Sequence, residues 1–439
     1  MKKITCIHWF RQDLRLHDNP ALHAAIATGS VLPIYIRDTH NAGEHDLGSA
    51  SKWWLHHSLQ ALDASLGKTL SYYQGNPQDI LCDLIARLGI STVTWSRCYE
   101  PWRLARDAQI KAALKAAGVT VISKNSALLW EPWQVNKDDG TPYKVFTPFY
   151  RKGCLQAETP REPLVYPRDQ AQYLKDEEGA QTLESLRLLP TKSWQDNMAS
   201  CWDIGEEGAQ KACKKFISIG LKQYKDGRNE PAEPYVSRLS PYLHFGEISP
   251  HEVWHTVRNL EQDHNTEHFC RQLGWREFSH NLLYHNPALP RKNLQSKFDR
   301  FPWNNNPEHL RAWQKGLTGV PMVDAGMREL WQTGYMHNRV RMIVGSYLVK
   351  NLRMHWVEGE RWFWDCLVDA DLANNSASWQ WIAGCGADAA PYFRIFNPVT
   401  QGQKFDAKGH YVRQYLPELA RLPDKFLFSP WEAPKLVLQ

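Results

Sequence analysis

The sequence predicts an α/β domain built on a doubly wound parallel sheet, followed by an all-α domain. Three observations lead to this fold class: strands alternate with helices in the first third, a stretch rich in proline and charge follows, and helical periodicity dominates after residue 205. We place the α/β domain at residues 1–130, a connector at 131–204 and the helical domain at 205–439. A chain of 439 residues with 43% hydrophobic composition can bury two cores.

Five short stretches rich in β-branched and aromatic residues are the expected strands. They lie at residues 2–9, 30–38, 68–75, 92–99 and 119–125, and the expected helices between them include 51–65, 78–88 and 103–117. Strands separated by helices pair in parallel. Residues 17–20, His-Asp-Asn-Pro, predict one more helix start, with Asp18 or Asn19 as the N-cap and Pro20 in the first turn.

The remainder of the chain divides at about residue 205. Between residues 155 and 200 the sequence is rich in proline, charge and short apolar pieces, which predicts a long connector on the surface. Beyond it, segments such as HEVWHTVRNLEQ (251–262) and RVRMIVGSYLVKNLRMHW (339–356) place apolar residues at steps of three and four. That spacing is typical of amphipathic helices.

Composition excludes several classes of protein. No apolar run approaches the length of a membrane span, and the start MKKITCIHWF lacks the apolar stretch of a secretory signal. The nine cysteines form no CxxC pair, as expected of reduced thiols. We therefore expect a cytoplasmic, monomeric protein without a membrane partner, and its net charge of +5 permits a polyanionic ligand.

The segment HEVWH (251–255) matches the HExxH pattern of zinc proteases. His251 would lie in the first turn of its helix, because Ser249 and Pro250 precede it, and no convincing third ligand follows. We interpret the match as a coincidence and expect no metal site.

Two other segments have both a structural and a functional interpretation. DADLANNSASWQW (369–381) reads either as a capped turn or as the lining of a cofactor site, since no single helical face can hold all of its polar groups. SRLSPYLHFGEIS (237–249) is either an ordinary capped loop or a cradle for a pyrophosphate before a helix. No GxGxxG motif supports a classical dinucleotide fold.

Arginines lie beside aromatic and amide side chains in RQLGWREF (271–278) and MHNRVRM (336–342). Helical arginines are usually solvated, but this mixture also suits a cavity that accepts an unpaired base, with cations for the phosphates and an aromatic wall for stacking. The 20 tryptophans either fill the cores, which is the usual case, or supply stacking surfaces and sites for electron transfer.

Eight motifs, taken in order, resemble the DNA photolyase/cryptochrome family across nearly the whole chain. They are WFRQDLRLHDNPAL (9–22), SRLSPYLHFGEIS, WREF (275–278), NPEHLRAWQKGLTGVPMVDAGMREL (306–330), MHNRVRM, EGERWFWDCLVDADLANN (358–375), WQW (379–381) and DAAPYFRIFNP (388–398). The resemblance is nearest to microbial cyclobutane pyrimidine dimer photolyases of classes I and III. It implies light-driven repair of UV-damaged DNA by electron transfer from excited, reduced FAD to a flipped-out dimer.

The resemblance also implies a role for each matching residue. The residues implied to hold FAD are Tyr224, Ser237, Arg238, Leu239, Ser240, Arg341, Asp369, Asp371 and Asn375. Electrons would reach the flavin through Trp303, Trp356 and Trp379. The implied lesion cavity comprises Gln272, Trp275, Asn338, Met342 and Trp381. The implied contacts to DNA phosphates are Arg228, Arg276, Arg339 and Arg394.

Several positions separate members of this family. The alternative function is a blue-light-sensing cryptochrome, and we expect no signalling tail because the sequence ends at Gln439 soon after the helical core. Met342 favours repair, since plant-type cryptochromes usually carry Val there, and Asn338 replaces the second histidine of a 6-4 photolyase. Gln272 stands where many class I enzymes have Glu, so it can form hydrogen bonds but cannot donate a proton as an acid.

The sequence leaves the identity of the family's second chromophore open. The folate pattern of well-known class I members has Asn-Glu where this sequence has Trp102-Arg103, which makes that folate mode doubtful. A folate in another pose, a deazaflavin, another flavin or no antenna at all are the alternatives.

Overall fold

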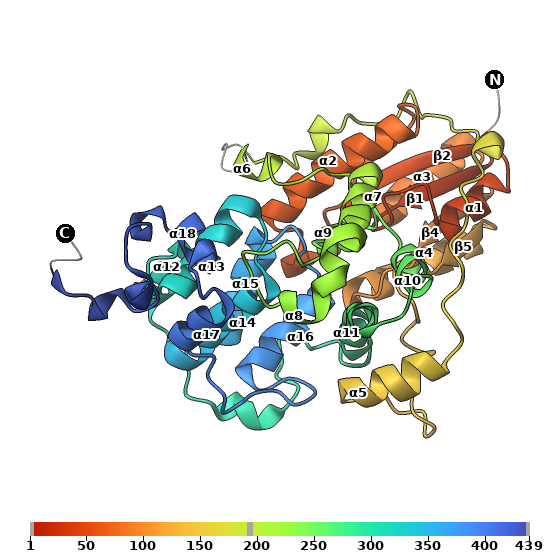
Figure 1. Cartoon of the computed structure of the whole chain (residues 1–439). Helices are drawn as coiled ribbons and strands as arrows, with labels where there is room; N and C mark the ends of the chain where they lie inside the picture. The colour runs from red at the N-terminus through yellow and green to blue at the C-terminus, as the bar shows by residue number, and fades with distance from the viewer. Residues whose placement is uncertain (1–3, 191–195, 436–439) are drawn as a thin grey trace.

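The computed structural model describes residues 4–190 and 196–435 and confirms the predicted fold class, a parallel α/β part followed by a helical part (Figure 1). The strands are β1 (Cys6–Phe10), β2 (Val31–Asp38), β3 (Ser71–Gly75), β4 (Thr92–Ser96) and β5 (Thr120–Lys124). The helices of this part are α1 (Pro20–Ile26), α2 (Ser49–Ser65), α3 (Pro77–Leu88) and α4 (Pro101–Ala116). Lys2 and Lys3, which the first predicted strand includes, lie outside the described residues.

The sheet has the order β3-β2-β1-β4-β5, and every neighbouring pair is parallel. β1 is central and fully buried because helices cover both faces. Cys6 pairs with Val31 on one side and with Thr92 on the other. The chain reverses its winding between β1 and β4, so a topological switch point, the usual place for a ligand in such a sheet, lies at their carboxyl ends.

The predicted cap of α1 is confirmed in detail. Asn19 is the N-cap and accepts a hydrogen bond from the Leu22 backbone at 3.1 Å, with Pro20 as the first helical residue. Asp18 instead pairs with Arg161 of the connector.

The helical part begins after residue 205, as the sequence predicts. Its helices are α7 (Glu206–Lys215), α8 (Tyr224–Gly227), α9 (Ser240–Phe245), α10 (Pro250–Arg258), α11 (His264–His285), α12 (Pro307–Lys315), α13 (Pro321–Thr333), α14 (Asn338–Ser346), α15 (Trp356–Cys366), α16 (Leu372–Ala383), α17 (Pro398–Phe405) and α18 (His410–Tyr415). Within residues 131–190 and 196–204, the connector carries the short helices α5 (Phe146–Pro148) and α6 (Asp196–Ala199), a π-helical turn at Phe149–Gly153 and short 3-10 turns. None of the helices in the described ranges is long and apolar enough to cross a membrane.

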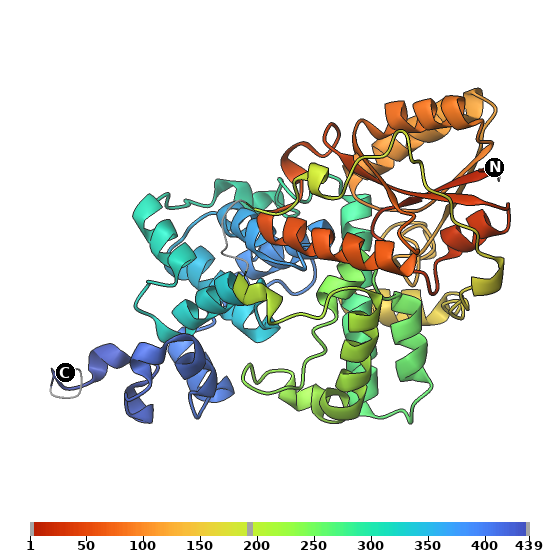
Figure 2. The same cartoon turned by 90° about the horizontal axis from the view of Figure 1, so that it is seen from above.

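The two parts share one core. Figure 2 shows α2 running from the sheet to the helical part, where it packs against α15. Trp54 of α2 is fully buried and lies near Tyr242 and Phe245 of α9. A second apolar cluster, which includes Trp313, Trp356 and Trp379, lies within the helical part.

The motif at residues 9–22 fastens these parts together. Arg15 is 1% exposed and donates to the carbonyls of Gly246 at 2.8 Å and Ser126 at 3.1 Å. Glu206, at the start of α7, accepts from the backbone of Leu16 and His17 at 2.9 Å. Gly246 has φ +69°, and a Cβ there would collide with the carbonyl group of Gln12.

The HEVWH segment lies at the same junction. His251 and His255 point their ring nitrogens at backbone carbonyls, including Leu128 O at 3.0 Å and Pro160 O at 2.9 Å. Burial and the nearby Arg161 lower the pKa of His251 to about 4. Both side chains therefore help to join α10 to the connector.

Candidate functional site

The centre of the candidate site is an ion pair between half-buried Arg341 on α14 and buried Asp369 in the segment before α16. Arg341 Nη2 lies 2.8 Å from Asp369 Oδ2, and Arg341 Nε donates to Met336 O at 2.7 Å. Ser240, the first residue of α9, donates its hydroxyl to Asp369 Oδ2 at 2.6 Å. Burial opposes the charge of Arg341, but Asp369 outweighs it and raises the pKa of the guanidinium. Residues from three distant motifs thus meet at one carboxylate.

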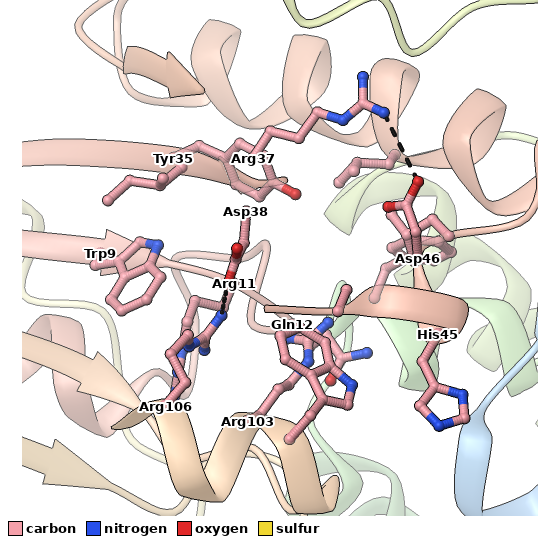
Figure 3. A pocket seen from close by; sticks show the side chains of 16 residues that line it. Trp9, Arg11, Gln12, Tyr35, Arg37, Asp38, His45, Asp46, Arg103 and Arg106 are labelled. Atoms are coloured by element: carbon pink, nitrogen blue, oxygen red, sulfur yellow. Dashed lines mark hydrogen bonds and ion pairs between the residues drawn. The ribbon is translucent and has the colours of Figure 1, made fainter. Parts of the chain in front are cut away.

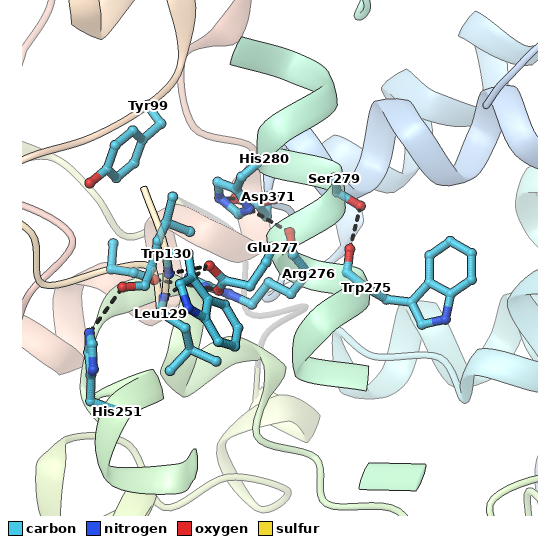
Figure 4. A network of polar contacts seen from close by, with 12 residues as sticks. Tyr99, Leu129, Trp130, His251, Trp275, Arg276, Glu277, Ser279, His280 and Asp371 are labelled. Carbon is cyan, nitrogen blue, oxygen red and sulfur yellow. Dashed lines mark hydrogen bonds and ion pairs between the residues drawn. The ribbon is translucent and has the colours of Figure 1, made fainter. Parts of the chain in front are cut away.

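The segment at 369–381 combines both interpretations of its sequence. Asp371 caps α16 by accepting from the Asn374 backbone at 2.8 Å, which confirms the capped start. Its other oxygen faces His280 Nε2 at 3.4 Å and His244 Nδ1 at 3.9 Å. Burial alone would raise the pKa of Asp371, but these histidines hold it well below its ordinary value. Figure 4 shows His280 pointing from α11 toward Asp371.

Asn375 lies one turn into α16 and is 8% exposed. Its Nδ2 donates to Glu360 O at 3.0 Å and to Glu360 Oε1 at 3.3 Å. Neither His280 nor Glu360 had been singled out from the sequence. Glu360 belongs to the EGERWFWD motif, but nothing in its local pattern indicates which residue it contacts.

Some of the buried polar atoms without a hydrogen-bond partner belong to the same segments as this centre. Within residues 4–190 and 196–435 they include both ring nitrogens of His244, Nε of Arg238, Nε2 of His337 and Oγ of Ser376. Arg238 also has φ +52°, an uncommon backbone conformation for a residue with a side chain. Buried polar groups normally have partners, so such orphaned groups indicate a ligand. Their donors and acceptors fit the phosphates, hydroxyls and ring edge of FAD.

The remaining residues implied for FAD lie nearby on α8 and α9. Tyr224 is buried, with its ring 5.5 Å from that of Phe216 and 5.4 Å from that of Phe269. Ser237 accepts from the Leu239 backbone at 3.3 Å, immediately before α9. The predicted arrangement of a hydroxyl-rich loop followed by a helix is therefore present.

The implied lesion cavity draws its walls from both cores. Trp275 on α11 packs on the first core and stacks on Phe146 at 3.7 Å with an interplanar angle of 11°. Trp381 and Met342 pack on the second core. Figure 4 shows Trp275 pointing away from the His280–Asp371 network. Gln272 is half-buried on α11, and Asn338 is exposed at the start of α14.

The implied phosphate contacts differ in exposure. Arg394 is exposed, Arg228 is half-buried, and Arg339 donates to Asn229 Oδ1 at 2.6 Å and lies 4.4 Å from the ring of Phe405. Arg276 differs from them: its side chain is 14% exposed, and its Nη1 donates to Ala127 O at 2.7 Å and to Glu277 at 3.2 Å (Figure 4). These bonds tie one nitrogen of the guanidinium to the domain junction, and its implied phosphate contact stays a prediction.

The three tryptophans implied in electron transfer are connected through α15. Trp379 lies against this helix so closely that a side chain at Gly359 would collide with it. Trp356, the first residue of α15, donates to Asn293 at 2.9 Å. His355 lies between Trp303 and Trp356, with ring centroids 5.0 Å and 5.6 Å away.

A separate pocket lies in the N-terminal part, at the carboxyl ends of β1 and β2 (Figure 3). Arg106 crosses it, donating to Asp38 at 3.0 Å with its guanidinium 4.9 Å from the ring of Trp9 and 5.1 Å from that of Trp102. Arg103 also lines the cavity. The two residues that depart from the class I folate pattern, Trp102 and Arg103, therefore belong to this lining.

Comparison with known proteins gives consistent matches. The family model for DNA photolyase matches residues 6–168, and the model for the FAD binding domain of DNA photolyase matches residues 269–439. The chain is 46% identical to a deoxyribodipyrimidine photo-lyase of Agrobacterium fabrum, over 100% of this chain and 92% of that protein. It is 36% identical to cryptochrome-1 of Arabidopsis thaliana, over 99% of this chain and 66% of that protein.

The solved structures agree with the sequence matches. A class III photolyase from Agrobacterium tumefaciens superposes with a TM-score of 0.95 at 46% identity, covering 100% of this chain and 92% of that one.

Proposed function

The chain belongs to the DNA photolyase/cryptochrome family, and on that premise we propose that it is a light-dependent lyase that splits cyclobutane pyrimidine dimers in DNA. The observation that carries this function is the Asp369–Arg341 centre, which Ser240 joins through a hydrogen bond. We propose that Trp275 and Trp381, which pack beside different cores, wall the site of the dimer. When bound, reduced FAD supplies the photoexcited electron that opens the cyclobutane ring.

The protein's own residues then bind and orient the two partners. Arg341, Asp369 and Ser240 hold the flavin, with Tyr224, Ser237, Arg238, Leu239, Asp371 and Asn375 around it. Trp275 and Trp381 offer apolar faces to the extrahelical pyrimidines, and Met342 fills the space beside them. Arg228, Arg339 and Arg394 neutralise phosphates, which contributes affinity without sequence preference.

The test is illumination of the purified protein, with its flavin reduced, in the presence of an oligonucleotide that carries one cyclobutane dimer. We expect restored pyrimidines by chromatography, and a large loss of dimer binding in Trp275→Ala, because stacking contributes about 1–3 kcal/mol per base. A protein that binds FAD but repairs no dimer would instead support the cryptochrome alternative.

We also propose that Trp379, Trp356 and Trp303 pass electrons from the surface to the flavin. Their support is the ring contacts of Trp303 and Trp356 with His355, together with the close approach of Trp379 to Gly359 on the helix that Trp356 begins. Trp379→Phe should block photoreduction of oxidised flavin but leave repair intact after chemical reduction. The measurement is flavin absorbance under blue light with and without dithionite, and normal photoreduction in the variant would remove Trp379 from the path.

We further propose that the cavity of Figure 3 holds a second, light-absorbing chromophore. Trp9 and Trp102 offer stacking faces, and Arg103 and Arg106 offer cations to an anionic group. Release of bound chromophores, followed by their identification by mass, tests this proposal. Recovery of FAD alone from protein purified from its native host would contradict it.

A further inference from the structure

Arg291 joins a carboxylate of the N-terminal part to a carboxylate of the helical part. Its Nε lies 2.9 Å from Glu44 Oε2, and its Nη1 lies 3.2 Å from Glu360 Oε2. Glu44 precedes His45 and Asp46, which line the cavity of Figure 3. Glu360 is only 2% exposed, whereas Arg291 is 27% and Glu44 53% exposed. The bridge therefore runs from the surface to a buried carboxylate.

That buried carboxylate determines the orientation of Asn375. The Asn375 amide nitrogen has two hydrogens, and its two bonds, to Glu360 O at 3.0 Å and Glu360 Oε1 at 3.3 Å, use both of them. The hydrogen-bond network is what distinguishes the oxygen of such an amide from its nitrogen. With the nitrogen held by Glu360, the oxygen is the polar atom left to face a ligand.

Arg291 governs whether the Glu360 carboxylate can accept the second of these bonds, whereas the backbone carbonyl of Glu360 accepts the first in either state. Burial raises the pKa of Glu360, Arg291 is the main opposing influence, exposed Arg361 opposes it more weakly, and Glu44 adds to the rise. A buried carboxylate that loses its cationic partner becomes protonated. A protonated group that donates to Asn375 competes with the backbone carbonyl for the amide, which raises the fraction of molecules in which the amide nitrogen faces outward.

We propose that Arg291 is a positioning residue that holds the oxygen of the Asn375 amide toward the flavin, through Glu360. This inference rests on the proposed function, because it requires FAD beside Asn375. An amide oxygen accepts from the ring N–H of a reduced flavin and so favours the reduced form. An amide nitrogen in the same place donates to the unprotonated ring nitrogen and favours the oxidised form. Through Glu44, the orientation also depends on the docking of the N-terminal part.

The experiment measures the midpoint potential of FAD bound to the full-length protein, by titration with redox dyes followed by absorbance. We expect Arg291→Met to lower the ratio of reduced to oxidised flavin about tenfold at a fixed potential, since a hydrogen bond involving a charged group contributes roughly 1.5–3 kcal/mol. Arg291→Lys should restore most of the ratio. Arg361→Met is the matched control, because it removes an exposed charge from α15 without removing the bridge, and it should leave the ratio near that of the wild type.

Glu360→Gln separates orientation from charge. In this variant Arg291 selects the glutamine oxygen, so the glutamine nitrogen faces Asn375 and turns the amide round. Loss of a negative charge by itself would favour reduced flavin, whereas the turned amide favours oxidised flavin. We therefore expect Glu360→Gln to shift the ratio in the same direction as Arg291→Met.

Two outcomes overturn the inference. If FAD bound to Arg291→Met has the wild-type midpoint potential, the inference is wrong and the proposed function is unaffected. If Glu360→Gln shifts the ratio toward reduced flavin, the inference is also wrong. Glu360→Gln alone decides the question if circular dichroism shows that Arg291→Met does not fold. A wild-type protein that binds no FAD overturns the proposed function itself, and the inference falls with it.

Discussion

At the level of single residues, the arginines implied in DNA binding differ in which protein groups their guanidinium groups already contact. Arg339 is half-buried beside Arg228, and burial followed by repulsion from Arg228 lowers its pKa, so a phosphate would relieve that repulsion. Arg276 is already bonded to Ala127 O and Glu277. Arg339→Ala should reduce the slope of log affinity against log salt by about one, measured by fluorescence anisotropy with dimer-containing duplex.

Arg276→Ala is the matched comparison for this measurement. It should leave the salt slope unchanged and lower stability by about 1–3 kcal/mol, because Ala127 O and the buried Glu277 lose a donor. The reverse result, a reduced salt slope for Arg276→Ala alone, would mean that Arg276 contacts DNA phosphates and that Arg339 does not.

At the scale of elements, the start of α16 depends on the ionisation of the pair formed by Asp371 and His280. Burial opposes the charge of His280, but Asp371 outweighs it and raises the pKa of the imidazole above 6.5. The stability from this pair is therefore complete below pH 6.5 and is lost as pH rises through the raised pKa of the folded state. The stability that comes from the lowered pKa of Asp371 is lost only in acid, as the pH falls below 3.8.

Urea unfolding between pH 6 and pH 9 tests the role of His280. The wild-type protein should lose stability across this range, and His280→Gln should lose less, because the glutamine has no charge to give up. If the free energy of unfolding changes equally with pH in the two proteins, His280 is neutral in the folded state. Asp371 would then interact only with the start of α16 and with His244.

The elements themselves could largely be predicted from the sequence, whereas their contacts could not. Periodicity located α10 and α14, and the Asn19-Pro20 pair located the start of α1. Periodicity does not reveal which element opposes a given face. The bond from Ser240 to Asp369 joins positions 129 residues apart, and the bridge from Glu44 through Arg291 to Glu360 crosses both parts of the chain. The bond from Arg276 to Ala127 O could not be predicted for the same reason, because its acceptor is a backbone carbonyl.

For the molecule as a whole, the junction of the two parts contains a carboxyl group that remains protonated at neutral pH. Glu247 is 0% exposed, accepts from Gly205 N at 3.0 Å and from Trp54 Nε1 at 3.1 Å, and burial raises its pKa to about 8. Because the unfolded chain releases this proton near pH 4.5, the stability contributed by Glu247 falls as pH rises from about 4.5 to about 8.

Glu247→Gln should therefore gain melting temperature relative to the wild type when both are moved from pH 6 to pH 9. The glutamine keeps an oxygen for Gly205 or Trp54 but never ionises. Differential scanning calorimetry at the two pH values provides the comparison. If the two proteins lose melting temperature in parallel, Glu247 is ionised at both pH values and the junction tolerates its charge.

The placement of the lesion cavity between two cores predicts which DNA lesion the whole molecule repairs. Trp275 belongs to one core, and Trp381 and Met342 belong to the other, so two apolar walls can enclose two adjacent pyrimidines joined by a cyclobutane ring. Repair of a 6-4 photoproduct also requires an acid that returns the transferred hydroxyl group. Asn338 cannot supply it. His337 cannot supply it either, because burial and then the charge of Arg339 lower its pKa to about 3, so the imidazole is neutral at neutral pH. Its Nδ1 also accepts from the Arg339 backbone at 3.1 Å.

We therefore expect light-dependent repair of cyclobutane dimers in double-stranded DNA and none of 6-4 photoproducts. Each defined lesion, in single-stranded and in duplex oligonucleotides, is illuminated with the reduced protein and analysed by chromatography. A sample of the reduced protein kept in the dark serves as the control, because repair requires light. Repair of the 6-4 lesion would show that another acid reaches the cavity and would overturn the roles given to Asn338 and His337. Repair confined to single strands would mean that the arginines beside the cavity do not hold the duplex while a dimer leaves it.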